Sequence, residues 1–304
     1  MKLQVAPAPH IHNEQDVSLI LYQVLLALLP ATLFGILRFG VPALVVVFTS
    51  VATCVGLEAC VNRLRREPLT ILDGSAALTG LLLALVLPPV LPIWMIILSA
   101  FVAIVVTKHA FGGLGYNLFN PALTGRLFLT VAFPALLTSQ GSGNGLVPGN
   151  VTPVLVNHAQ LFFGGLPGNI GETSSLALLI GVFYLFRKGI IDWKIPTSFL
   201  GTVFLFSLVA KQDPFFHLMT GGVILGAFFM MTDYVTSPVT KMGRLLYGML
   251  IGVLVMSIRL FSSASEGIVY SIVLMNGFVP VLDQVGIRLH MYLYDVLFPR
   301  VNAE

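Results

Sequence analysis

The sequence contains little charge. Of its 304 residues, 16 are lysine or arginine and 13 are aspartate or glutamate, whereas 57% are hydrophobic and the mean hydropathy is +0.94. Too few polar groups remain to cover the surface of a water-soluble domain of this size. The composition therefore excludes a soluble enzyme and predicts an all-α polytopic membrane protein that lies in a lipid bilayer. The net charge of +3 comes from dispersed residues and does not indicate a nucleic-acid partner.

Cysteine is also scarce, since Cys54 and Cys60 are the two in the chain. A spacing of six residues places them on different faces of a helix, which excludes a disulfide between them. An iron–sulfur cluster normally takes four thiolates, so this chain alone cannot hold one, although a cluster shared with a partner protein stays open. The sequence also lacks the spacing of a zinc site, a Walker loop and a nucleophile elbow. We interpret both cysteines as packing residues.

Long hydrophobic runs take up most of the chain. They predict about ten transmembrane helices in one transmembrane domain over residues 1–304, made of a first five-helix half (1–138), an outer loop (139–174) and a second five-helix half (175–304). The ten runs are 17–37, 41–61, 74–90, 92–107, 121–138, 175–186, 195–210, 218–232, 243–260 and 267–282.

Three of these runs are short or interrupted, which is typical of broken helices that line a site within a membrane. The third and the eighth runs share a Leu/Met-Thr-Gly triplet, Leu78–Gly80 and Met219–Gly221, followed by apolar residues. The shared triplet favours a 5 + 5 inverted repeat, because a second half that follows five spans enters the membrane from the opposite side. A rival match of Asn120–Leu127 with Ser237–Leu245 conflicts with that order, and we favour the first.

The basic residues are distributed unevenly between the two sides of the membrane. With ten spans that start inside, cytoplasmic segments contain twelve lysines and arginines, outer loops contain three, and Arg126 lies within the fifth span. The positive-inside rule then places both termini in the cytoplasm and the loop 139–174, which has no lysine or arginine, outside. We expect no cleavable signal peptide, because the first hydrophobic run is too long for one.

The segment Gly164–Ser175 has the richest chemistry on the predicted outer side. Its glycines and proline disfavour regular structure, and an apolar helix follows directly, so that Glu172, Thr173 and Ser174 stand at a helix N-terminus at the mouth of a membrane segment. Unpaired backbone N–H groups and the helix dipole make such a place favourable for a phosphate.

A polar loop, Lys108–Pro121, lies on the predicted cytoplasmic side. Its glycines allow a planar ligand to approach the backbone, and Asn117 and Asn120 offer hydrogen-bond donors and acceptors. The alternative is a glycine-rich turn in which asparagine caps the helix that starts at the proline.

Three carboxylates stand at or within the predicted spans. Asp73 and Asp233 lie at membrane boundaries, where each either caps a helix or contacts a ligand or ion. Glu58 lies deeper, in the second run, and the sequence indicates no partner for it beyond an orientation toward the protein interior.

Four motifs carry a resemblance that covers nearly the whole chain. They are Asp73–Gly80 with Leu87-Pro88-Pro89, Phe111–Ala122, Gly171–Ser174 and Met231–Pro238, in this order. With these motifs the chain resembles the RnfD/NqrB family, the membrane subunits of the ion-translocating Rnf complex and of the sodium-pumping NADH:quinone oxidoreductase. The short segment before the first span is similar to the RnfD branch, because the NqrB branch has a longer N-terminal region associated with quinone.

The resemblance implies a flavin-carrying subunit of an oxidoreductase complex that translocates Na⁺ or H⁺ across the bacterial cytoplasmic (inner) membrane. Such a subunit is one part of a translocase and not a complete enzyme. The family pattern implies FMN joined to Thr173 through a phosphoester bond that a separate flavin transferase makes, with Gly171, Glu172 and Ser174 around it.

A noncovalent riboflavin toward the cytoplasmic side is also implied, and Asn117, Asn120 and Asp73 are its candidate contacts. The implied partners are other membrane and peripheral subunits of the same complex, including a second subunit with covalent FMN and iron–sulfur subunits.

A channel or secondary transporter is the alternative function. Broken helices and an inverted repeat suit that class equally well. This alternative predicts no bound chromophore, so a covalent flavin distinguishes the two.

Overall fold

A computed structural model of the chain describes residues 17–141, 158–164, 168–262 and 267–297. The predicted cytoplasmic N-terminal tail, residues 142–157 of the predicted outer loop, residues 165–167 of the glycine-rich motif and the C-terminal residues 298–304 lie outside the described residues. Within the described part every regular element is a helix, which confirms the predicted all-α class. Four helical stretches are long and apolar enough to cross a membrane, namely Val17–Phe39, Val41–Arg65, Lys241–Phe261 and Gly267–Leu289.

Shorter helices make up the rest of the fold. The elements in chain order are α1 (Val17–Phe39), α2 (Val41–Arg65), η1 (Ile71–Asp73), α3 (Ser75–Val86), α4 (Ile93–Phe101), η2 (Val102–His109), α5 (Pro121–Ala132), α6 (Pro134–Gly141), α7 (His158–Phe163), η4 (Ile170–Glu172), α8 (Ser175–Arg187), α9 (Lys194–Val209), α10 (Pro214–Met219), α11 (Val223–Leu225), η5 (Gly226–Met230), α12 (Lys241–Phe261) and α13 (Gly267–Leu297). Among them η1 and η4 are 3₁₀ turns, and η2 and η5 are π-helical segments.

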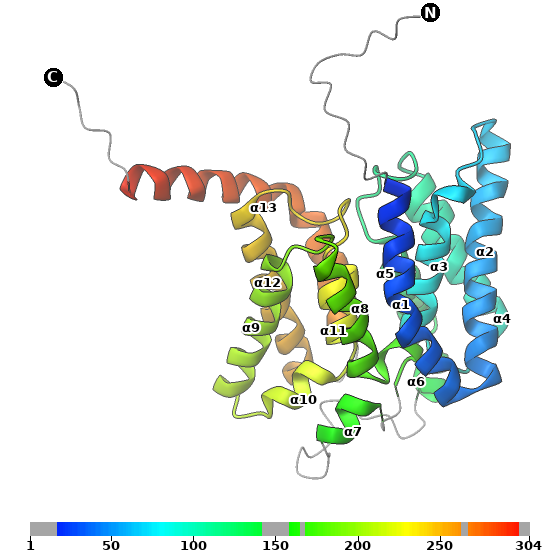
Figure 1. Ribbon diagram of the computed structural model, residues 1–304, viewed down its shortest axis with the longest axis horizontal. Coiled ribbons are helices and arrows are strands. Elements are labelled where there is room, and N and C mark those ends of the chain that lie inside the picture. Colours follow the sequence, from blue (N-terminus) through cyan, green and yellow to red (C-terminus); the bar gives the residue numbers. More distant parts are fainter. Residues whose placement is uncertain (1–16, 142–157, 165–167, 263–266, 298–304) are drawn as a thin grey trace, which may run out of the picture.

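The two halves of the chain lie side by side (Figure 1). Helices α1 to α6 form one group and α9, α10, α12 and α13 the other, with α8 and α11 between them. The groups meet where α1 packs against α8 and where α5 packs against α13. The start of α1, the end of α2 and the end of α13 lie at the upper edge of Figure 1, whereas α6, α7 and α10 lie at the lower edge.

Two helices stop within the thickness of the protein, as the sequence predicts. Helix α3 ends at Val86, because Leu87 precedes a proline and takes an extended backbone, with φ −90° and ψ 150°. Helix α10 ends at Met219, and Gly221 and Gly222 separate it from α11 with positive φ values of 61° and 71°. Such breaks expose backbone groups that need other partners.

The triplets that suggest the inverted repeat occupy different local structures. Leu78–Gly80 lies inside α3, where Gly80 allows α2 to approach so closely that an added Cβ would lie 2.7 Å from the Cα of Val51. Met219–Gly221 instead runs from the last residue of α10 into the break. The triplets are therefore not structural equivalents, and the 5 + 5 repeat stays a prediction.

The last helix is longer than the predicted span. The sequence predicts a span that ends at residue 282, but α13 continues to Leu297 with Pro280 inside it. Proline removes a helix hydrogen bond and bends the helix. Figure 1 shows the C-terminal part of α13 turned sideways, away from the direction of its first part.

Candidate functional site

The Gly-Glu-Thr-Ser motif forms a short loop that leads into a helix. Residues Ile170–Glu172 make the single 3₁₀ turn η4, and Ser174 is the N-cap of α8. The Ser174 hydroxyl oxygen accepts a hydrogen bond from the backbone N–H of Ala177 at 3.3 Å. As the sequence predicts, Glu172, Thr173 and Ser174 stand at a helix N-terminus. We call residues 169–174 the attachment loop.

The attachment loop is fixed to the end of the first broken helix. The backbone N–H of Ile170 donates to the carbonyl oxygen of Leu87 at 3.2 Å. Gly171 packs so closely on this helix end that an added Cβ would lie 2.7 Å from the Cβ of Leu85 and 3.1 Å from its carbonyl oxygen. Residue 171 must therefore be glycine for the loop to lie here.

The same loop contacts the second broken helix through Glu172. A Cβ at Gly222 would lie 2.7 Å from Oε1 of Glu172, so the carboxylate lies directly on the break between α10 and α11. Asn169 holds the carboxylate in place, since its Nδ2 donates to Glu172 Oε1 at 2.9 Å. The attachment loop thus joins a break from each half of the chain.

Two buried arginines surround this junction. Arg126 and Arg259 are 2% and 3% exposed and interact electrostatically with Glu172. Arg259 donates from Nη1 to the carbonyl oxygen of His217 at 2.8 Å and from Nη2 to that of Thr220 at 2.9 Å. Its guanidinium therefore satisfies carbonyl groups that the end of α10 leaves without helical partners.

The sequence reading placed Arg126 within the fifth span, where α5 has it, but predicted the contacts of neither arginine. Charge counting assigned Arg259 to an outer loop and gave Arg126 no role, because pattern reading does not show which buried carbonyl or carboxylate a cation will meet. The sequence does contain a signal for the contact of Arg259, namely an arginine within an apolar run together with a Thr-Gly-Gly break elsewhere whose carbonyl groups need donors. The sequence reading did not connect the two.

The Thr173 hydroxyl has the chemistry that a phosphoester needs, but it is not exposed. Its Oγ1 donates to the carbonyl oxygen of Ile170 at 3.3 Å, and the residue is 5% exposed. Gly164, with φ 98°, lies close to the backbone of Thr173 and leaves too little space for a Cβ between Phe34 and the carbonyl oxygen of Thr173. The residues fit an ester-linked FMN at a helix N-terminus.

A cavity lies at the opposite end of α3 from the attachment loop. Its empty volume, which includes the open mouth, is ≈ 830 Å³. Ser75, at the start of α3, lines the cavity, whereas Leu85, ten residues later, contacts the attachment loop. Ten helical residues correspond to about 15 Å, which is roughly half the thickness of a bilayer core.

The cavity is apolar on most of its surface and polar on one side. Helices α1, α3, α8 and η5 supply aliphatic and aromatic side chains, and the polar groups come from η2, the loops and α3, which contributes Ser75 and Thr79. The π-helical segments contribute directly, with Lys108 from η2 and Phe228 and Phe229 from η5. Segments of this kind occur often at functional sites.

The structure brings together two of the three candidate riboflavin contacts. Asn117 and Asn120 both line the cavity and are both buried. Each also has a structural role, since Asn117 Nδ2 donates to the carbonyl oxygen of Phe119 at 3.1 Å and Asn120 caps α5. Asp73 is not part of the lining. Its Oδ1 accepts hydrogen bonds from the N–H and the hydroxyl of Ser75 at 2.7 Å and 2.6 Å, so it caps α3.

A buried ion pair borders the cavity and gives Glu58 the partner that the sequence did not indicate. The Nζ of Lys108 lies 2.6 Å from Oε2 of Glu58 and also donates to the Ser75 hydroxyl at 2.6 Å. The other carboxylate oxygen of Glu58 accepts from Thr70 at 2.8 Å, and Thr70 in turn accepts from Asn62 at 2.8 Å. A charge pair at this depth is stable because further hydrogen bonds support both of its members.

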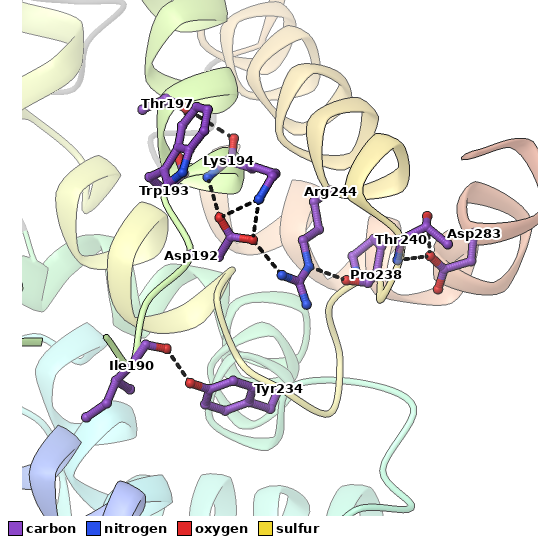
Figure 2. Close-up of polar contacts among 10 residues, drawn as sticks. All are labelled: Ile190, Asp192, Trp193, Lys194, Thr197, Tyr234, Pro238, Thr240, Arg244 and Asp283. Atoms are coloured by element: carbon purple, nitrogen blue, oxygen red, sulfur yellow. Dashed lines mark hydrogen bonds and ion pairs between the residues drawn. The ribbon is translucent and has the colours of Figure 1, made fainter. Parts of the chain in front are cut away.

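Hydrogen bonds between loops fix the second-half wall of the cavity (Figure 2). Tyr234 and Ile190 both line the cavity, and the tyrosine hydroxyl donates to the isoleucine carbonyl oxygen. Beside them Asp192 accepts from Lys194 Nζ at 3.0 Å and from Arg244 Nη1 at 2.6 Å. Partial burial raises the pKa of the Asp192 carboxyl, but the hydrogen bonds from Lys194 and Arg244 outweigh this effect and hold the pKa below its ordinary value.

The same network holds the loop that precedes α12. Arg244 Nε donates to the carbonyl oxygen of Pro238 at 2.9 Å. Asp283 on α13 accepts from the backbone N–H of Thr240 at 2.9 Å and from its hydroxyl at 2.7 Å. The Met231–Pro238 motif is therefore held at Tyr234 and at Pro238, with Asp233 on the cavity side.

Comparison with known proteins gives a consistent result. The model of the NQR2, RnfD, RnfE family matches residues 4–290. The D subunit of the Na⁺-translocating ferredoxin:NAD⁺ oxidoreductase complex of Acetobacterium woodii is 41% identical over 297 residues, which cover 93% of this chain and 93% of that protein. The D subunit of the proton-translocating ferredoxin:NAD⁺ oxidoreductase complex of Clostridium ljungdahlii is 39% identical over 308 residues, with coverage of 92% and 93%. The D subunit of an ion-translocating oxidoreductase complex of Methanosarcina acetivorans is 35% identical over 280 residues, with coverage of 92% and 93%.

Proposed function

This chain belongs to the NQR2, RnfD, RnfE family, and on that basis we propose that it is the flavin-carrying membrane subunit of an ion-translocating oxidoreductase complex. It passes electrons through FMN esterified to Thr173 and through a noncovalent riboflavin in the cavity. The flavins supply the electron chemistry when bound, and the protein holds them in place and sets their surroundings. The relatives differ in the ion that their names give, Na⁺ in one and H⁺ in another, so similarity alone does not assign the ion.

One observation carries the proposal. The attachment loop joins the breaks of two helices, and the same short helix α3 that it contacts at Leu85 lines the cavity at Ser75. The two cofactor sites thereby lie at opposite ends of one rigid element. That arrangement supports a route for electrons across about half of the bilayer at fixed spacing.

The wider architecture belongs to the same proposal. Ten spans in two inverted halves, both termini in the cytoplasm and the attachment loop on the outer side of the inner membrane suit the charge distribution of the sequence. Partner subunits with covalent FMN and iron–sulfur clusters are the electron donors and acceptors that such a subunit requires, and a flavin transferase completes its maturation.

In-gel fluorescence tests the covalent flavin. The chain is co-expressed with the flavin transferase and the other subunits, unfolded in detergent, separated on a gel and viewed under ultraviolet light. We expect a fluorescent band for the wild type and for Thr173→Ser, which keeps a hydroxyl, and no band for Thr173→Val. A dark wild-type band removes the covalent flavin from the proposal and favours a transporter without a chromophore, whereas a bright Thr173→Val band places the ester elsewhere.

Acid extraction tests the second flavin. Leu78 lines the cavity, so Leu78→Trp fills it, whereas Leu205 on α9 is 63% exposed and Leu205→Trp adds the same bulk outside the cavity. We expect the first variant to lose extractable riboflavin and the second to keep it. Equal riboflavin in both would place this flavin elsewhere.

A further inference from the structure

The polar side of the cavity is built around a buried lysine whose hydrogen bonds are incomplete. Lys108 is 2% exposed, and an ammonium group has three N–H donors. The carboxylate of Glu58 and the hydroxyl of Ser75 take two of them. Among the residues that the structure describes there is no partner for the third, although Lys108 forms part of the cavity wall. A buried cation of this kind is stable when a ligand in the cavity accepts the third hydrogen bond.

The surroundings of Lys108 favour a ligand that accepts hydrogen bonds and gains negative charge. Glu58 neutralises the ammonium, while Asp73 acts on it only through the Ser75 hydroxyl. The remaining lining offers apolar and aromatic surface, with Asn117 and Asn120 on the polar side. A planar ring system with carbonyl oxygens fits this combination, and charge on such a ring interacts strongly with Lys108 because the lysine is buried.

We infer that Lys108 contacts the flavin in the cavity and, as one half of the Glu58–Lys108 pair, sets the reduction potential of that flavin. This inference rests on the second flavin of the proposed function. The ammonium favours the negative charge that reduction adds to the ring, and the carboxylate opposes it. Removal of one partner therefore changes the potential in a direction that depends on which partner is removed.

A charge series tests the inference. The full-length chain is produced without the flavin transferase, so that only noncovalent flavin is bound, and its midpoint potential is measured by spectroelectrochemical titration. Lys108→Met leaves a net negative charge, and we expect a lower potential than in the wild type. Glu58→Gln leaves a net positive charge and should raise the potential. The double variant removes both charges and should return toward the wild-type value, whereas Lys108→Arg keeps the charge and most of the effect.

Controls separate this effect from loss of structure. Lys241 is an exposed lysine, and Lys241→Met should leave the potential unchanged. If Lys108→Met does not accumulate, Glu58→Gln can be compared with the double variant, which differs from it only in lacking the lysine. The inference requires a higher potential in Glu58→Gln than in the double variant.

Three results would overturn the inference. Equal potentials in Glu58→Gln and the double variant show that Lys108 does not act on the flavin. Shifts of the same sign in Lys108→Met and Glu58→Gln show a general structural effect. A wild-type chain without extractable flavin removes the second flavin itself, and with it this inference. That result differs from a bound flavin whose potential does not respond, which overturns the inference alone.

Discussion

Glu172 lies directly on Gly222, and a Cβ at residue 222 would be 2.7 Å from Oε1 of the carboxylate. This contact joins the attachment loop to the break between α10 and α11, which lies fifty residues later in the chain. The glycine serves twice here, because its φ of 71° also forms the break between α10 and α11.

Substitution of Gly222 by alanine should therefore reduce flavin attachment. The positive φ costs an alanine about 1 kcal/mol, and the new methyl group pushes the Glu172 carboxylate away from Asn169. Gly171→Ala should be more severe, since its Cβ meets the backbone and the Cβ of Leu85. We expect weaker in-gel flavin fluorescence at equal protein amount for Gly222→Ala and a weaker band still for Gly171→Ala.

A matched glycine provides the control for this prediction. Gly201 lies in α9, is exposed and has no neighbouring atom within 4 Å of an added Cβ. Gly201→Ala should keep the full flavin signal and stabilise the helix by about 0.5–1 kcal/mol. Equal flavin signals in Gly201→Ala, Gly222→Ala and Gly171→Ala would show that the loop does not depend on the two breaks.

Ser174 should be dispensable for the ester, although it is adjacent to Thr173. Its hydroxyl oxygen caps α8, and loss of such a cap costs about 1 kcal/mol. Ser174→Ala should therefore lower the melting temperature of the detergent-solubilised protein by a few degrees, while the fluorescent band remains. A dark Ser174→Ala band beside a bright Thr173→Val band would move the attachment site to Ser174.

Local rules account for the parts of the site that the sequence predicted. The helix N-terminus at Glu172–Ser174, the break after Val86 and the glycine break at Gly221 and Gly222 follow from the conformations that serine, proline and glycine favour within a few residues. The helix class follows equally directly from the length of the apolar runs.

Distant partners account for what the sequence did not predict. Lys108 pairs with Glu58 across fifty residues, and Arg259 contacts the His217 carbonyl across forty-two. A count of charges assigned both cations to loops, because each lies near the end of a predicted span. Nothing in the sequence indicated that other segments bury them. The burial of Thr173 is a similar case, since Gly164, from another segment, packs against its carbonyl oxygen.

Asp192 should make stability depend on pH in the acidic range. The hydrogen bonds that lower its pKa favour the ionised form, so its contribution to folding is present above the ordinary aspartate pKa of about 4 and is lost as the pH falls below it. We expect Asp192→Asn to cost on the order of 1 kcal/mol at pH 7 and less at pH 3, where part of the contribution of the carboxylate is lost. Thermal unfolding followed by tryptophan fluorescence at both pH values checks this, and a constant difference at the two pH values would contradict it.

The proposed orientation can be tested by cysteine labelling. In a Cys54→Ala, Cys60→Ala background, one cysteine is introduced as Lys211→Cys, in the connection between α9 and α10, and another as Glu67→Cys, in the segment after α2. Figure 1 shows α10 at the lower edge and the end of α2 at the upper edge. Both residues are exposed. An impermeant maleimide should label residue 211 in cells whose outer membrane is open, and residue 67 only after the inner membrane is disrupted. The reverse pattern would place the attachment loop on the cytoplasmic side.

Arg259 should be essential for the second break. Arg259→Met keeps most of the side-chain volume but leaves the carbonyl oxygens of His217 and Thr220 without their donor, and each buried group without a partner costs about 1–3 kcal/mol. We expect a lower melting temperature, less protein in the membrane and weaker flavin fluorescence per molecule, because Glu172 loses the cation beside it.

Arg259→Lys keeps the charge but cannot reach both carbonyls, so it should retain more flavin than Arg259→Met at similar stability. Arg63→Met, at an exposed arginine near the end of α2, is the matched control and should leave all three measurements unchanged. Wild-type behaviour of Arg259→Met would show that the break is held by the backbone alone.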